Sequence, residues 1–144
     1  MKFITAIALL ATSAAALNVP RWDTDGTYQL RYDSTYGNPS QSLSVVSCSN
    51  GDNGMITKGY NTVGDVPTYV GAAQGVSWDS PNCGTCWQIS YGDKSINMVA
   101  VDYAASGFRV SPAAMDYLTN NQAFNLGVVD VQVKQVDKSV CNVH

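Results

Sequence analysis

The stretch that decides the fold is Cys86-Trp-Gln-Ile-Ser-Tyr91, followed by Gly92-Asp93 and then by Lys94-Ser-Ile-Asn-Met-Val-Ala-Val101. Both long runs contain the β-branched and aromatic residues that favour strands. Glycine in the first position of a two-residue connection is typical of a type II′ turn, whose twist suits paired antiparallel strands. These residues therefore predict a β-hairpin, and Trp87 is expected to be buried within its first strand.

Apolar and polar residues alternate in three further segments on both sides of this hairpin, which predicts three more strands. The segments are Thr27–Tyr32, Ser42–Cys48 and Val128–Val136. Between the first two, Tyr36-Gly-Asn-Pro-Ser40 predicts a turn. Residues 49–82 are interrupted by glycine at short intervals, so a long irregular loop is expected between Cys48 and Cys83.

One helix is expected after the hairpin, because Ser111-Pro112 combines a favoured N-cap residue with proline in the first helical position. Asn120-Asn121 is expected to end its regular part. The side chains expected on its buried side are Met115, Leu118 and Phe124. Since only this segment has a helical pattern, the chain is predicted to be mainly β.

The composition supports a turn-rich β protein and excludes several functions. All 11 acidic residues are Asp, which favours turns and caps, whereas Glu favours helix interiors. The formal net charge is −3 and the basic residues are scattered singly, so neither nucleic acid nor anionic lipid is an expected partner. No glycine-rich phosphate loop is present, and the single histidine, His144, argues against a catalytic triad.

The N-terminus has the pattern of a secretion signal. Lys2 precedes the apolar run Ile4–Leu10, which is shorter than the ~20 residues that span a bilayer, and Ala14 and Ala16 form an A-x-A cleavage site. We expect a signal peptide over residues 1–16, a loose arm over 17–26 and one domain over 27–144. The mature protein is therefore expected outside the cell, without membrane insertion.

Four cysteines are expected to form two disulfides in a secreted chain, with three connectivities open. The Cys83-Gly-Thr-Cys86 spacing leaves a redox pair or half of a zinc site as alternatives. A reactive thiolate usually lies at a helix N-terminus, whereas a strand is predicted after Cys86. Zinc would lack supporting histidines. We therefore expect structural disulfides, with no metal and no cofactor.

Asp102 is the main candidate for chemistry, because it follows the apolar strand Ile96–Val101 and precedes the segment Tyr103–Gly107. Burial at such a place can keep a carboxyl group protonated, as a general acid requires. The alternative is a structural aspartate that caps the following turn, and spacing alone favours it. Asp79 is a weaker candidate, because an aspartate before Ser80-Pro81 is common in ordinary turns. Exposed members of the three Trp and eight Tyr could line a sugar-binding groove.

Two motifs and the segment after Asp102 carry a family resemblance. They are Cys48-Ser-Asn-Gly-Asp52, Trp78-Asp-Ser-Pro-Asn-Cys-Gly-Thr-Cys-Trp87, and Val101-Asp102 through Gly107-Phe108. Together with the order of the cysteines, they resemble the cerato-platanin family of secreted fungal proteins over about residues 27–143. The resemblance implies a six-stranded double-psi β-barrel with one or two short helices, related to expansins and to a family of endoglucanases. It also implies the disulfides Cys48–Cys83 and Cys86–Cys141.

The resemblance further implies a function in the fungal cell wall and its surroundings. Such a protein binds chitin or N-acetylglucosamine oligomers, loosens polysaccharide without hydrolysis and is recognised by a plant receptor as an elicitor; some members are allergens. Asp102 matches the aspartate that corresponds to the expansin and endoglucanase acid. An inverting glycosidase needs a second carboxylate ~6.5–9.5 Å away, and none can be assigned from the sequence. We therefore expect a glycan-binding site without catalytic residues, comprising Asp102, Tyr32, Asp33, Ser49, Asn50 and Asp52.

Two alternatives stay open at this point: a weak endoglucanase-like hydrolase, and a surface-active or receptor-recognised protein that acts without a glycan. Cellulose is a second possible ligand beside chitin. Tyr103-Ala-Ala-Ser-Gly107 replaces a more glycine-rich segment that is usual after the family aspartate. The shape of the groove, and with it the preferred glycan, is expected to differ accordingly.

Overall fold

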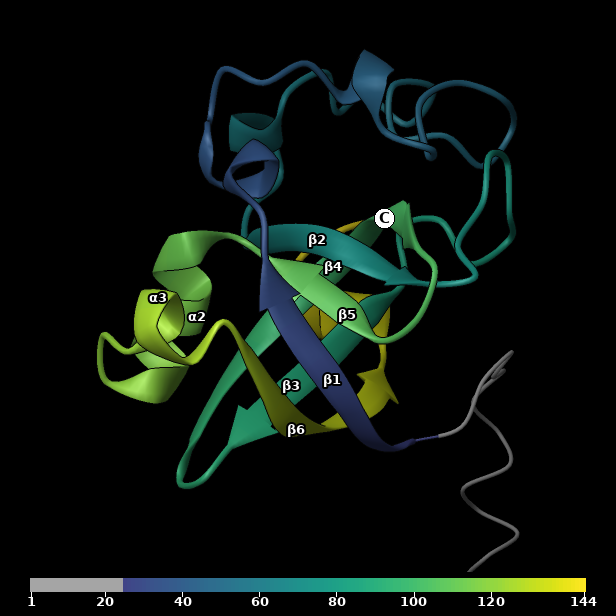
Figure 1. The fold of residues 1–144 in the computed structure, drawn as a ribbon. Helices are drawn as coiled ribbons and strands as arrows, with labels where there is room; N and C mark the ends of the chain where they lie inside the picture. Colours follow the sequence, from purple (N-terminus) through teal and green to yellow (C-terminus); the bar gives the residue numbers. More distant parts are fainter. Residues whose placement is uncertain (1–24) are drawn as a thin grey trace, which may run out of the picture.

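The structure, a computed structural model, describes residues 25–144, so the expected signal peptide and residues 17–24 of the expected arm lie outside it. Six strands form a closed barrel in the order β1-β5-β2-β4-β3-β6 (Figure 1). Their bounds are β1 Gly26–Tyr32, β2 Tyr69–Gln74, β3 Cys86–Tyr91, β4 Lys94–Ala104, β5 Phe108–Val110 and β6 Val128–Val136. The pairs β1–β5 and β2–β4 are parallel, and the other neighbours are antiparallel. The predicted mainly β, double-psi barrel is confirmed.

The predicted hairpin is strands β3 and β4, paired in register from Cys86 opposite Val99 to Tyr91 opposite Lys94. Gly92 begins the turn with φ of 62°, a left-handed conformation that glycine adopts without steric cost. Trp87 is 0% exposed, as predicted. Its ring lies 5.3 Å from that of Phe108, in an edge-to-face arrangement that aromatic pairs favour. This aromatic contact joins β3 to β5 in the centre of the core.

Helix α2, Pro112–Thr119, begins as predicted: the Ser111 side chain accepts a hydrogen bond from the backbone N–H of Ala114 at 3.1 Å. Met115 and Leu118 are buried. The prediction for Phe124 is wrong, since this side chain is 85% exposed. Both residues after α2, Asn120 and Asn121, have positive φ, so the chain changes direction. Phe124 consequently belongs to a separate short helix, α3 Ala123–Leu126, and no longer follows the buried side of α2.

Two sequence predictions for the first half of the domain are also corrected. Residues 42–48 are not a strand but contain the 3-10 turn η2, Leu43–Val45, which the Ser42 hydroxyl caps by accepting from the N–H of Ser44. Strand β2 lies within the segment that was expected to be wholly irregular. Gly71, which interrupts the sequence pattern, is required there, because a side chain would collide with the carbonyl of Arg109 and with Met98. Gly71 suggested a loop in the sequence, but in the structure it allows neighbouring strands to approach each other closely.

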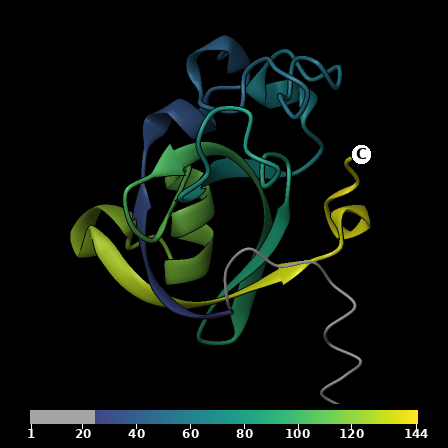
Figure 2. The same cartoon turned by 90° about the vertical axis from the view of Figure 1, so that its right-hand side faces the viewer.

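Residues 33–68, hereafter the cover, connect β1 to β2 across one end of the barrel (Figures 1 and 2). They contain only the short turns η1 Ser34–Gly37, η2 and η3 Val63–Asp65. The disulfide Cys48–Cys83 links the cover to the segment before β3, and Cys86–Cys141 links β3 to the turn η4, Lys138–Cys141. This is the pairing that the family resemblance implies. Because the two cysteines of the Cys83-x-x-Cys86 motif belong to different disulfides, the redox and zinc interpretations do not hold.

Among the helices of residues 25–144, none combines the length and apolarity needed to cross a membrane.

Candidate functional site

Asp102 lies within strand β4, which continues to Ala104, and not just after a strand as the sequence suggested. Its carboxylate joins the barrel to the cover. One oxygen, Oδ2, accepts a hydrogen bond from the Tyr36 hydroxyl at 2.8 Å. The other, Oδ1, accepts from the backbone N–H of Ser47 at 2.9 Å and of Tyr103 at 2.8 Å. A single side chain therefore holds η1 and the middle of the segment 33–68, just before Cys48.

These contacts distinguish between the two interpretations of Asp102. The structural interpretation is correct in part, since the carboxylate binds backbone N–H groups, although one of these belongs to a distant segment. A general acid must instead present a proton to the leaving group. Every contact of Asp102 is with a hydrogen-bond donor, which suits an ionised carboxylate that only accepts. The arrangement favours an acceptor over a proton donor.

Tyr36 is only 6% exposed, and its hydroxyl remains a donor. Burial raises the pKa of this phenol well above its ordinary value, and the hydrogen bond to Asp102 raises it further. The negative charges of Asp102 and Asp33 act in the same direction, while the charge of Arg109 opposes them. Tyr36 could not be assigned from the sequence, because its partner is 66 residues away and nothing in its local pattern marks it.

The register of the strands places charged side chains in one row across the outer face of the barrel. Arg31 of β1 is opposite Arg109 of β5, Arg109 is opposite Ala72 of β2, and Ala72 is opposite Asp102 of β4. Residues directly opposite one another in a sheet project to the same face. Both arginines are exposed. Arg109 could not be assigned from the sequence because β5 has only three residues and no alternation long enough to recognise, and Arg31 enters the row only through its pairing with Arg109.

A second cluster forms where the Cys48–Asp52 loop meets residues 77–82. The Trp78 indole N–H donates to Asn50 Oδ1 at 2.7 Å, and the backbone N–H of Asn53 donates to Asp79 Oδ1 at 2.9 Å. Trp78 is nevertheless 59% exposed. Asn50, expected to contact a glycan, therefore holds this ring in place. Asp79 has the turn role that its sequence suggested, in a left-handed conformation with φ of 59°.

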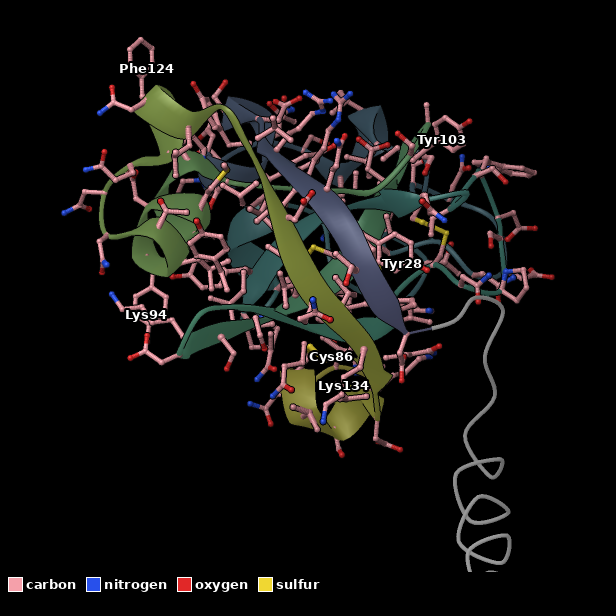
Figure 3. The ribbon with its side chains drawn as sticks, turned by 60° about the horizontal axis from the view of Figure 1, so that its bottom comes forward. Tyr28, Cys86, Lys94, Tyr103, Phe124 and Lys134 are labelled. Atoms are coloured by element: carbon pink, nitrogen blue, oxygen red, sulfur yellow. A yellow bond between two sulfur atoms is a disulfide. The ribbon has the colours of Figure 1, made fainter. Side chains whose placement is uncertain are left out.

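Ser47 connects the two clusters. Its backbone N–H donates to Asp102, and its hydroxyl donates at 2.7 Å to the carbonyl of Val76, two residues before Trp78. Tyr103, next to Asp102 in the chain, is 53% exposed, and Figure 3 shows it far from Phe124. Ser47 and Val76 thus link Trp78 to the Asp102 carboxylate, while Tyr103 is its neighbour in the chain.

The remaining predicted site residues are placed as follows. The Asp33 carboxylate caps η1 by accepting from the N–H of Thr35 at 2.9 Å, and Tyr32 packs partly against the core. Ser49 and Asp52 lie on the loop that carries Asn50, and within residues 25–144 no hydrogen bond joins this loop directly to Asp102. The structure therefore groups Asp102 and Asp33 around Tyr36, and of the three loop residues it bonds Asn50 to Trp78.

A closed six-stranded barrel with two parallel strand pairs, two disulfides and a polar outer face defines a small double-psi β-barrel protein. More specifically, the chain belongs to the cerato-platanin family, whose model, described as Cerato-platanin, matches residues 28–143. Members of this family are secreted fungal proteins known for elicitor-like activity and are generally non-catalytic.

Relatives and solved structures cover nearly the whole domain. The chain is 46% identical over 147 residues to the Heat-stable 19 kDa antigen of Coccidioides immitis (strain RS), with 98% of each chain aligned. It is similar to cerato-platanin 3 from M. perniciosa, at 51% identity and a TM-score of 0.79 over 81% of this chain and 99% of that one. It is also similar to the solution structure of the fungal elicitor Cerato-Platanin, at 39% identity and a TM-score of 0.70 over 78% and 95% of the two chains.

Proposed function

We propose that the protein is a secreted, non-hydrolytic glycan-binding protein that loosens wall polysaccharide, in the manner of expansins, by binding chitin or N-acetylglucosamine oligomers. The proposed glycan-binding face carries Asp102 and Arg109, and Trp78 is linked to it through Ser47 and Val76. The observation that supports it best is the Asp102 carboxylate, which three donors hold in place as an acceptor.

The chemistry of these side chains suits an uncharged sugar polymer. An ionised carboxylate has about four acceptor sites, so Asp102 keeps one for a sugar hydroxyl after its three internal bonds. The guanidinium of Arg109 supplies donors for hydroxyl or acetamido oxygens. The fixed, exposed indole of Trp78 can stack on the apolar face of a pyranose ring. Together these groups match both the polar rim and the apolar faces of a glycan chain.

The same contacts support binding without hydrolysis. Hydrolysis requires an acid that protonates the glycosidic oxygen and a second carboxylate that activates water or attacks the sugar. Asp102 is surrounded by donors, and the Asp33 carboxylate already accepts a hydrogen bond from Thr35. A protein that binds wall glycans in this way can also be an elicitor, since the family includes the fungal elicitor Cerato-Platanin.

The test is a titration of the purified mature protein with the hexamer of N-acetylglucosamine, and with cellohexaose for comparison, by calorimetry. We expect Asp102→Asn and Trp78→Ala each to weaken binding of the preferred oligomer about tenfold, which corresponds to about 1.4 kcal/mol. Phe124→Ala is the matched control, because it removes an exposed aromatic ring that lies away from the site. Equal affinities for all four proteins would contradict the proposed face.

One observation favours a second candidate function, recognition of the protein surface itself. Phe124, Leu126 and Tyr117 expose apolar side chains on α2 and α3. Exposed apolar groups of this kind often mark interaction sites. If plant recognition uses this surface, Phe124→Ala will reduce the defence response while Asp102→Asn leaves it intact. The reverse pattern would make the response depend on the glycan-binding face.

A further inference from the structure

A separate cavity of about 490 Å³ lies between η1, the segment from η3 into β2, and the start of α2. We call it the tyrosine cleft. Its walls include two tyrosine rings and several apolar side chains: Tyr36, Tyr69, Val63, Val66, Pro67 and Ala113. The volume is within the range of about 300–1,000 Å³ that is common for small-molecule sites. None of the residues assigned above to the glycan-binding face lines it.

The walls offer little to a sugar or to an ion. No Asp, Glu, Lys, Arg or His side chain is among the residues that line the cleft. The hydroxyl of Thr68 already donates to the carbonyl of Asn97 at 3.0 Å, and the Ser111 hydroxyl already caps helix α2. The side chains that line the cleft therefore offer a sugar few hydrogen-bond partners and a charged ligand no ion pair.

We propose that the tyrosine cleft binds an uncharged aromatic ring, such as a phenol or a small fused-ring compound. A flat ring buries apolar area against valine and proline, and it can pack edge-to-face or offset against the Tyr69 ring, which is 37% exposed. This inference is independent of the proposed glycan-binding function, since a different set of side chains carries it.

The cleft is nevertheless in contact with the glycan-binding face through one residue. The Tyr36 ring forms part of its wall, and the hydroxyl of the same ring donates to Asp102. We expect a ligand that touches the small exposed part of Tyr36 to disturb the Asp102 carboxylate and the Ser47 N–H bound to it. Binding in the cleft is therefore expected to be detectable at Ser47, outside the cleft itself.

The test is a titration of the ¹⁵N-labelled protein with 2-naphthol, followed by amide chemical shifts. We expect saturable shifts at Gly37, Gly64 and Val70 in the cleft walls, and a smaller shift at Ser47. The charged analogue naphthalene-2-sulfonate is expected to bind at least tenfold more weakly, because no cation lines the cleft. This comparison needs no variant, so it holds even if a substitution disturbs folding.

A blocking variant gives a second measure. Ala113 is exposed at the start of α2 and lines the cleft, so Ala113→Trp should fill the opening and weaken naphthol binding at least tenfold. Ala105→Trp is the matched control, because it adds the same ring at an exposed alanine that does not line the cleft. The proposal would be overturned by an absence of saturable shifts, by equal binding of naphthol and the sulfonate, by shifts centred on Phe124, or by unchanged binding in Ala113→Trp.

Discussion

The barrel and the cover obtain their structure in different ways. The barrel strands are joined by continuous backbone pairing and enclose a core in which Trp87 is fully buried. The cover contains only short 3-10 turns and is held by side-chain capping, by Asp102 and by the Cys48–Cys83 disulfide. Most of the polar groups around the candidate site belong to the cover or bind it. The barrel therefore supplies stability, whereas a few long-range polar contacts determine the shape of the site.

The largest expected effect is in the barrel. Trp87→Ala should lower the free energy of unfolding by roughly 3–5 kcal/mol, because it removes a fully buried aromatic side chain from the core. Urea denaturation monitored by circular dichroism measures this. Trp78→Ala is the control, since its exposed ring should change stability by no more than about 0.5 kcal/mol. Similar losses in both variants would remove the distinction between the two regions.

The next effect concerns the covalent link of the cover. Replacing Cys48 and Cys83 together by alanine should cost roughly 2–4 kcal/mol, since the disulfide closes a long segment of the chain. Amide hydrogen exchange distinguishes the cover from the barrel in this variant. Exchange of the Met55 amide, which donates to the carbonyl of Cys48, should become faster, while the amides paired between β3 and β6 keep their relative protection. A uniform increase in exchange throughout the domain would show that the cover is not a separate unit.

Much of the barrel could be predicted from the sequence, because its signals are local. The β3–β4 hairpin follows from strand composition around a Gly-Asp turn, β6 follows from alternation, and the start of α2 follows from Ser111-Pro112. Strand β2 could not be predicted, since Gly71 is there to allow close approach of a segment distant in sequence. Phe124 was misplaced because the periodicity of α2 does not continue beyond the left-handed asparagines.

The candidate site was less predictable than the barrel. Asp102 was found from its place near the end of an apolar strand and from the family resemblance. Tyr36, Arg109 and Trp78 were not assigned, because each becomes part of the site through a partner or strand neighbour that only the folded chain brings near. The predicted role of Asn50 changed for the same reason, as its side chain is bound to Trp78.

A smaller effect is expected when one contact between cover and barrel is removed. Tyr36→Phe deletes the hydroxyl that donates to Asp102 and should cost about 1 kcal/mol. It should also speed exchange of the Ser47 amide, which binds the same carboxylate. Tyr60→Phe is a suitable control, because its hydroxyl contacts His144 and not Asp102. If Ser47 exchange rises equally in both variants, Asp102 does not link the cover to the barrel as described.

The smallest effect is a pH dependence within the cover. Hydrogen bonds from the N–H groups of Asn61 and Thr62 lower the pKa of Asp65 below its ordinary value of 3.8. A lowered folded-state pKa stabilises the protein above the unfolded-state pKa, and this contribution disappears as the pH falls through the folded-state value. Asp65→Asn should therefore reduce the free energy of unfolding more at pH 7 than at pH 2. An equal reduction at both pH values would contradict this cause.

The most direct test of the proposed function asks whether the protein binds glycan at Asp102 without cleaving it. The protein would be incubated with chitin oligomers while NMR follows the amides of Tyr103 and Ser47 and the indole N–H of Trp78, and reducing ends are assayed in the same samples. We expect saturable shifts at these groups, weakened in Asp102→Asn, with no new reducing ends. Cleavage that disappears in Asp102→Asn would instead make Asp102 a proton donor in a hydrolase, and an absence of shifts would contradict the proposed glycan-binding face.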